Sequence, residues 1–218
     1  ETLTDKNRIK FNGSLFTNGF IELIRYKKTI AYTLISGFVT GSFMVYLSSS
    51  QQVFQEQYGL KEAFPYIFAG LATASGAAIL LNGFFVVKYG MKKIINFATI
   101  GFFVVSLIYI LLFWNSPNPN IEVLLVFFAL QFFFLGFLFG NLRAIAMQPV
   151  GHIAGIAAAI TGLISTLMAV PISIFIGRYV DTTALPLFIG FSVCSLLSIF
   201  IIGALKLKDS KNKKTTSL

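Results

Sequence analysis

The sequence predicts an all-α membrane protein of six transmembrane helices, arranged as two inverted repeats of three helices each. Three observations support this fold class: a composition poor in charge, six long apolar stretches and a one-sided distribution of basic residues. Of the 218 residues, 56% are hydrophobic and only 11% are charged, whereas soluble domains carry about 25% charged residues. Such a composition favours lipid over water as the solvent around most of the chain.

The segment 1–28 is expected to form a linker on the cytoplasmic side of the membrane. Within it, Phe16, Phe20, Ile21 and Ile24 recur near helical spacing and alternate with polar residues. This pattern predicts an amphipathic helix that lies on the cytoplasmic face of the membrane.

Six apolar stretches follow, each with the roughly 20 residues that a helix needs to cross a bilayer. They cover residues 29–51, 64–87, 94–114, 122–147, 152–177 and 184–205, and a basic tail follows at 206–218. The connections between them carry turn-forming residues such as Gly59, Gly90, Pro117 and Pro149. We therefore expect a single bundle of six helices over residues 29–205.

The basic residues predict the orientation of this bundle. With these spans, fifteen of the 17 lysines and arginines fall on one side, and only Lys61 and Arg178 fall on the other. Because short loops rich in Lys and Arg stay in the cytoplasm, both ends of the chain are predicted to be cytoplasmic. The net charge of +9 is then explained by orientation, and no nucleic-acid partner is expected.

The six helices form two similar triplets, each with a polar helix, a helix rich in small residues and a bulky apolar helix. Small residues let helix backbones approach closely, so the second and fifth helices are expected to be packing helices. Their small residues include Gly70, Ala74 and Gly76 in one helix, and Gly155, Ala158 and Gly162 in the other. Since each triplet has an odd number of helices, the second is inverted relative to the first, as in many secondary transporters.

Sequence motifs add a family resemblance. The run Ala146-Met147-Gln148-Pro149-Val150-Gly151-His152-Ile153-Ala154-Gly155, preceded by Asn141, resembles the Asn…Ala-Met-x-Pro-x-Gly-His-x-Ala-Gly stretch of one transporter family. The opening Glu1-Thr2-Leu3 and the run from Ser50 to Leu60 resemble two further motifs of that family. Almost the whole chain is similar to the C-terminal half of a major facilitator superfamily transporter, closest to the bicyclomycin-resistance drug exporters of bacteria. The superfamily's loop motif survives only in part, because Val87 replaces its aspartate.

The resemblance implies that the first and fourth helices line a central substrate cavity. Polar and aromatic residues at helical spacing are the candidate lining: Thr33, Ser36, Thr40 and Phe43 on the first helix, and Phe127, Gln131, Phe134, Leu138 and Asn141 on the fourth. The other interpretation is that these residues make ordinary contacts between helices. Pro171 is expected to kink the fifth helix, because proline removes one bond of the helical ladder.

The implied function is that of a proton-coupled multidrug efflux permease, which works by alternating access in the inner membrane of a bacterium. Its partners would be the N-terminal six-helix half of the same transporter, membrane lipid and a small lipophilic substrate. None of the eight acids lies in the middle of a span, so the carboxylate that titrates is expected in the other half.

Two alternatives stay open: a permease for a natural metabolite, such as an amino acid or a nucleobase, and a six-helix carrier that pairs with itself. An intramembrane protease would need a buried serine motif with a membrane histidine, or two membrane aspartates, and the spans contain neither. No cofactor is expected, and the lone Cys194 and lone His152 provide no ligand set for a metal.

Overall fold

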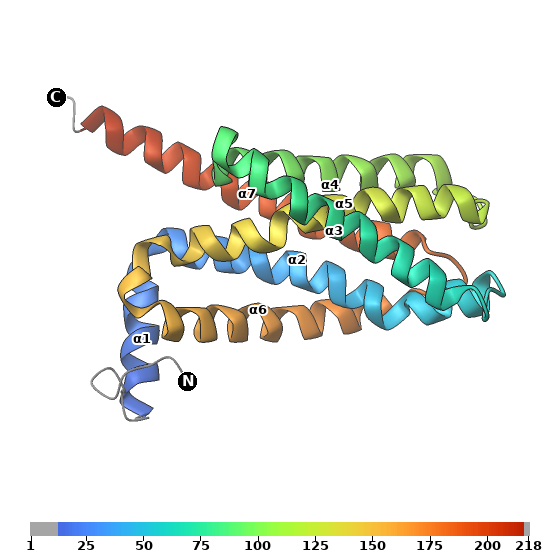
Figure 1. Cartoon of the computed structure of the whole chain (residues 1–218), viewed down its shortest axis with the longest axis horizontal. Helices are drawn as coiled ribbons and strands as arrows, with labels where there is room; N and C mark the ends of the chain where they lie inside the picture. Colours follow the sequence, from blue (N-terminus) through green and yellow to red (C-terminus); the bar gives the residue numbers. More distant parts are fainter. Residues whose placement is uncertain (1–12, 216–218) are drawn as a thin grey trace.

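The computed structural model describes the backbone of residues 13–215 and the side chains of residues 16–208. The described residues form helices joined by short connections, with no β-strand among them. Figure 1 shows the arrangement. The elements in chain order are α1 (Gly13–Arg25), α2 (Lys27–Gln51), the π-helical turn η2 (Gln52–Gln57), α3 (Phe64–Tyr89), α4 (Met91–Phe113), α5 (Ile121–Met147), the 3₁₀ turn η3 (Gln148–Ile153), α6 (Ala154–Gly177) and α7 (Leu185–Thr215).

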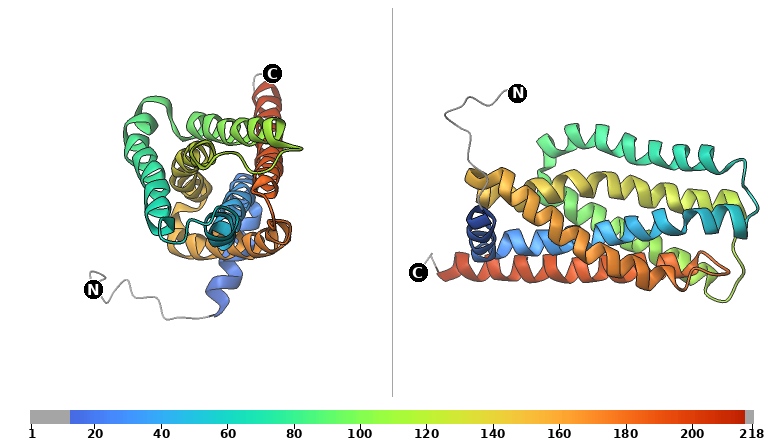
Figure 2. Two further views of the ribbon diagram at one scale, coloured as in Figure 1. Left: turned by 90° about the vertical axis from the view of Figure 1, so that its right-hand side faces the viewer. Right: turned by 90° about the horizontal axis from the view of Figure 1, so that it is seen from below.

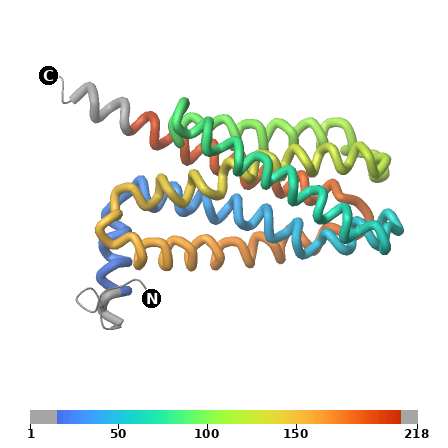
Figure 3. The backbone as a smooth tube through the Cα atoms, in the orientation of Figure 1, coloured from blue at the N-terminus to red at the C-terminus, as the bar shows by residue number. Residues whose placement is uncertain are grey.

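The predicted fold class is confirmed. In the described part of the chain, five helical stretches are long and apolar enough to cross a membrane. One of them, Ile121–Gly177, consists of α5 and α6 joined by η3, so α2 to α7 provide six spans. Figure 3 shows that α5 and α6 run in opposite directions from this turn. The last helix, α7, continues into the basic tail as far as Thr215.

The packing of the helices follows the predicted repeat. Helix α3 packs against α5 as α6 packs against α2, and α4 packs against α5 as α7 packs against α2. The remaining principal pairs are α2 with α5 and α4 with α7. Exchanging the triplet α2–α4 with the triplet α5–α7 therefore leaves this set of neighbours unchanged, which is the pattern expected of two repeats related by a pseudo-two-fold axis.

Aromatic rings fill the centre of the bundle. Tyr46 of α2 lies edge-on to Phe132 of α5, with ring centroids 4.6 Å apart. Tyr109 of α4 stacks on Phe188 of α7, and Phe128 of α5 packs against the same Phe188 ring. These five rings hold the two central helices, α2 and α5, to the outer helices α4 and α7.

The loops at one end of the bundle are joined by side-chain hydrogen bonds. Asn118, between α4 and α5, donates to Gln57 and accepts from the backbone N–H of Ala184, next to α7. Tyr58 donates to the carbonyl of Pro119 at 2.6 Å. Burial raises the pKa of Tyr58 to about 12, so its hydroxyl keeps this proton throughout the physiological pH range.

The opposite end carries most of the described basic side chains. Helix α1, the α3–α4 connection, η3 and the end of α7 all lie there (Figures 1 and 2). Arg25, Lys92 and Lys206 come from three of these segments, whereas Lys61 and Arg178 lie in connections at the other end. The one-sided charge distribution is thus a property of the folded bundle, and the cytoplasmic location of this end stays a prediction.

Helix α1 crosses this basic end at a steep angle to the spanning helices (Figures 1 and 2). Its Leu23 is 3% exposed and packs with Val150, Ala157 and Ile160 of η3 and α6. Glu22 binds His152 across the same contact, with 2.5 Å between Oε1 and Nε2. Helix α1 also has exposed apolar side chains, as expected for a helix at a membrane surface: Phe16, Phe20, Ile21 and Ile24.

We expect the docking of α1 to depend on Leu23 far more than on the ion pair. Replacing Leu23 with alanine removes buried methyl groups and should cost about 2 kcal/mol, whereas Glu22→Gln at an exposed pair should cost less than about 1 kcal/mol. Trypsin cleavage after Arg25 in the detergent-solubilised protein measures how often α1 opens. The L23A variant should be cut roughly 30 times faster, and the exposed-site control I21A should match the wild type. Equal acceleration in E22Q would contradict this assignment.

Candidate substrate site

One side of the bundle lacks neighbours within this chain. Helix α3 carries only two buried residues, Leu71 and Ala78. Of the small residues expected to pack, Gly70, Gly76, Gly155 and Gly162 have no atom within 4 Å of the position that a Cβ would take, while Ala74 is half-buried and Ala158 is exposed. These surfaces of α3 and α6 are therefore available to a partner.

A small polar cavity opens between α2, α5 and α6. Its volume is about 120 Å³. Its lining comprises Thr33 and Ser36 of α2, Leu142, Arg143, Ala146 and Met147 of α5, and Ala158, Thr161, Gly162 and Ser165 of α6. Two of the predicted cavity residues, Thr33 and Ser36, thus meet a guanidinium and two further hydroxyls.

Hydrogen bonds hold most of these hydroxyls in place. Thr33 donates to the carbonyl of Thr29 at 2.7 Å, and Thr161 donates to the carbonyl of Ala157 at 2.8 Å. Ser165 lies 3.5 Å from the carbonyl of Thr33 and so links α6 to α2. The hydroxyl oxygens keep lone pairs that a ligand in the cavity can use.

The other predicted residues of α2 lie outside this cavity. Thr40 is half-buried. Phe43 packs edge-on against Phe132 and Phe139 of α5. In the part of α2 that follows Thr40, the exposed side chains are those of Met44, Ser48 and Gln51, which follow helical spacing. The exposed face of α2 is thus a mixed apolar and polar surface. It is rotated about the helix axis relative to the face predicted to line the cavity.

The predicted residues of α5 mostly contact other helices. Gln131 is 1% exposed, and its Nε2 donates to Ser106 Oγ at 2.6 Å and to the Phe102 carbonyl of α4. Asn141 donates to Asn82 Oδ1 of α3 at 2.6 Å. The amides therefore tie α5 to α4 and to α3, and their part in a substrate cavity stays a prediction.

The predicted apolar residues of α5 also touch neighbouring helices. Phe127 packs edge-on against Tyr109 of α4. Leu138 is 1% exposed and lines a narrow space between α2, α4 and α7. Phe134 packs against Phe97 of α4. The nine predicted residues thus lie on several different faces of α2 and α5. They do not form one continuous wall.

The two amides are expected to differ in their effect on stability. Asn141→Leu leaves Asn82 without its partner and should cost about 1 kcal/mol. Gln131→Leu should cost less, because Gln131 Oε1 has no hydrogen-bond partner in the structure and Ser106 has its own bond to the Phe102 carbonyl. Thermal unfolding of the two purified variants measures the difference. A larger loss of stability in Q131L than in N141L would contradict this assignment of hydrogen bonds.

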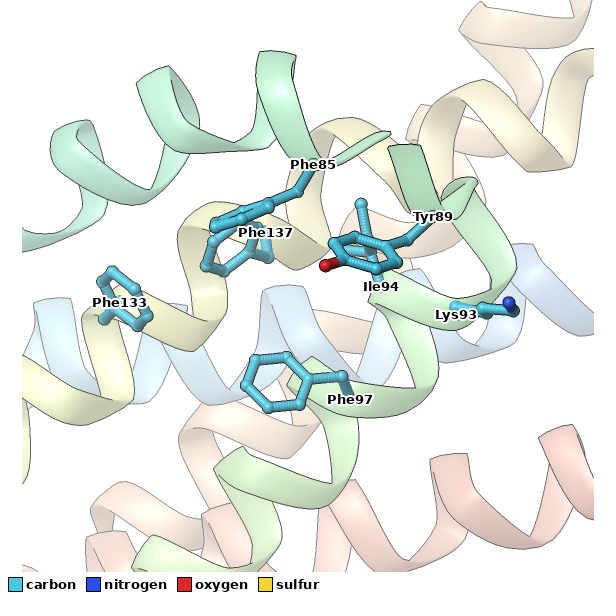
Figure 4. A pocket seen from close by; sticks show the side chains of 7 residues that line it. All are labelled: Phe85, Tyr89, Lys93, Ile94, Phe97, Phe133 and Phe137. Atoms are coloured by element: carbon cyan, nitrogen blue, oxygen red, sulfur yellow. The ribbon is translucent and has the colours of Figure 1, made fainter. Parts of the chain in front are cut away.

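Two larger hollows are almost purely apolar. Figure 4 shows the first, of about 480 Å³, between α3, α4 and α5. Phe85, Phe97 and Phe137 contribute to its aromatic wall, and the Lys93 amine points away from the rings. The second, of about 760 Å³, lies between α6, α7 and α2 and includes Pro171. The repeat relates these two sets of helices, so the hollows occupy equivalent places on the apolar exterior, where lipid chains would lie.

Sequence reasoning missed the α6 side of the polar cavity. Thr161 and Ser165 are four residues apart and so share one face of α6, a signal that the printed sequence contains. Arg143 of α5 also lines the cavity. Its involvement depends on how α5 is rotated against α2 and α6, which no local pattern reveals.

Fold and surface together define a multi-pass helical membrane protein with an open side. Among curated proteins, the chain is 25% identical over 217 residues to YdgK of Bacillus subtilis (strain 168), described as an uncharacterised MFS-type transporter. The match covers 97% of this chain and 52% of the relative, so the chain spans about half the length of the protein it matches. No family model and no solved structure matches the chain. The similarity supports the major facilitator resemblance, and the closer resemblance to the bicyclomycin-resistance family stays a prediction.

Proposed function

We propose that this chain forms one half of a major facilitator permease, and that a second helical half covers its open side. The observation that carries the proposal is the surface of α3 and α6: glycines such as Gly70 and Gly162 face open space on the helices that flank α2 and α5. Small residues on spanning helices serve to bring other helices close. The length of the relative, about twice that of the matched region, agrees with a second half.

In this proposal, transport works by alternating access: the two halves rock about a site near the bilayer midplane, between α2 and α5 of this half and their counterparts. The leading version is proton-coupled export of small lipophilic compounds from a bacterial cell, across its inner membrane, with both ends of this segment cytoplasmic. The described spans carry acids only near their ends, as Glu122 does in the first turn of α5. The carboxylate that binds the coupling proton is therefore assigned to the other half.

The competing version is a permease for a natural metabolite, since the same mixed surface of α2 suits either substrate. Cells that express the full-length gene product should accumulate less of an added lipophilic fluorescent dye than cells without it, and an uncoupler should abolish the difference. Unchanged dye accumulation together with export of a cell metabolite would exclude drug export in favour of the metabolite.

The self-pairing carrier predicts a different result. If this chain transports alone, the purified six-helix chain in liposomes should produce net flux of the same compound. If it is half of a transporter, only the full-length product should do so. Net flux from the six-helix chain would overturn the half-transporter proposal.

A further inference from the structure

The polar cavity between α2, α5 and α6 carries a positive charge, and no carboxylate among the described side chains neutralises it. Arg143 lines it one turn before the end of α5, and makes no ion pair or hydrogen bond with any residue that the structure describes. Among the described side chains at this end of the bundle, Glu22 is the only acid, and it binds His152 instead. The guanidinium of Arg143 offers N–H donors and no acceptor, so it suits an anionic ligand.

The surroundings of Arg143 add further attraction for an anion. Ser36 lines the cavity and makes no hydrogen bond among the described residues, so its O–H is free to donate. Helices α2 and α6 both begin at this end, at Lys27 and Ala154. The partial positive charges of their N-terminal turns therefore lie on the same side as the guanidinium.

The size of the cavity limits what it can hold. Drug-sized molecules occupy pockets of roughly 300–1,000 Å³, whereas this cavity offers about 120 Å³. That is enough for one charged group with its oxygens, and the apolar remainder of a ligand would lie on the open side of α2 and α5. A planar guanidinium matches the two oxygens of a carboxylate in a bidentate pair.

We propose that this cavity binds the carboxylate of the substrate, through Arg143 and the Ser36 hydroxyl, so that the transported compounds are lipophilic acids. The inference rests on the proposed function, because it names the substrate class of the same permease. It departs from the expectation of a merely lipophilic substrate. The same chemistry would also accept the phosphate of an anionic lipid, and the experiment below separates the two.

Binding is measured by thermal unfolding of the purified full-length product at pH 7, with matched acids and amides as probes: benzoate against benzamide, and octanoate against octanamide. At tenfold excess over Kd, the acids should raise the midpoint by about 2–4 °C and the amides should not. The increase should disappear in R143Q, shrink in R143K and S36A, and persist in R178Q, whose arginine lies at the other end of the bundle. If R143Q fails to fold, R143K and S36A carry the comparison.

Three outcomes would overturn the proposal. Equal stabilisation by acid and amide would show that the charge is not recognised. Acid stabilisation that persists in R143Q would place the anion elsewhere. Stabilisation by phosphatidylglycerol alone, dependent on Arg143, would make the cavity a lipid headgroup site. Because the readout is binding, the two proposals can fail separately. An Arg143-dependent acid effect in a protein that shows no flux would support the carboxylate site and refute the transport proposal.

Discussion

Replacing Gly136 with leucine is expected to detach α3 from the bundle. A Cβ at this position would lie 2.5 Å from the backbone oxygen of Ser75 and 2.7 Å from the Cβ of Ala78, both on α3. Backbone cannot move aside as a flexible side chain does, so even alanine should cost about 1–3 kcal/mol. Leucine should exceed that range, because α3 buries only Leu71 and Ala78 and has little else to hold it.

The measurement is cross-linking between α3 and α5. Cysteines at Asn82 and Asn141, whose side chains are hydrogen-bonded, report this contact in a background where Cys194 is serine. A short bifunctional thiol reagent should join them in the parent protein and fail in G136L. Gly140 provides the matched control, since it lies one turn further along α5 and has no atom near its Cβ position. Equal cross-linking in G136L and the parent would show that the two helices are further apart than the structure has them.

The close approach at Gly136 shows where prediction from sequence ends. Hydropathy and charge predict the fold class and the positions of the spans, because crossing a bilayer imposes a length and a composition on every helix. They do not give the rotation of each helix about its axis. The small residues of α3 were expected to pack, but the sequence did not show which of them would: Ala78 meets Gly136 of α5, whereas Gly70 meets open space.

The candidate site illustrates the same limit. Helical spacing grouped Thr33 with Thr40 and Gln131 with Asn141, and such a grouping assumes that one face of each helix is turned to the cavity. In the fold, Thr33 lines the cavity beside Arg143, while Gln131 turns to α4 and Asn141 turns to α3. In a nearly all-apolar sequence, the helix face that meets each neighbour is decided by packing among all six helices, and the pattern of one helix contains little of that information.

Tryptophan at Gly162 is expected to reduce transport strongly while leaving the six-helix bundle intact. A Cβ at Gly162 meets no atom within 4 Å, and Gly162 lines the α6 side of the cavity, so we expect this chain alone to accommodate the larger side chain. In the proposed transporter, that space is taken by the substrate or by the second half when the halves close. If the extra ring raises the free energy of the closed state by at least about 1.4 kcal/mol, that state becomes roughly tenfold rarer.

Gly203 of α7 supplies the control, because its Cβ position is equally free of neighbours but lies on a helix assigned to the lipid-facing exterior. Flux through the full-length product should fall about tenfold or more in G162W and stay near the parent value in G203W. Thermal unfolding of the isolated six-helix chain should be the same for both, since the Cβ position at each glycine is free of neighbours there. Undiminished flux in G162W would mean that nothing closes over this part of α6, and the partner surface would then have to be sought on α3 alone.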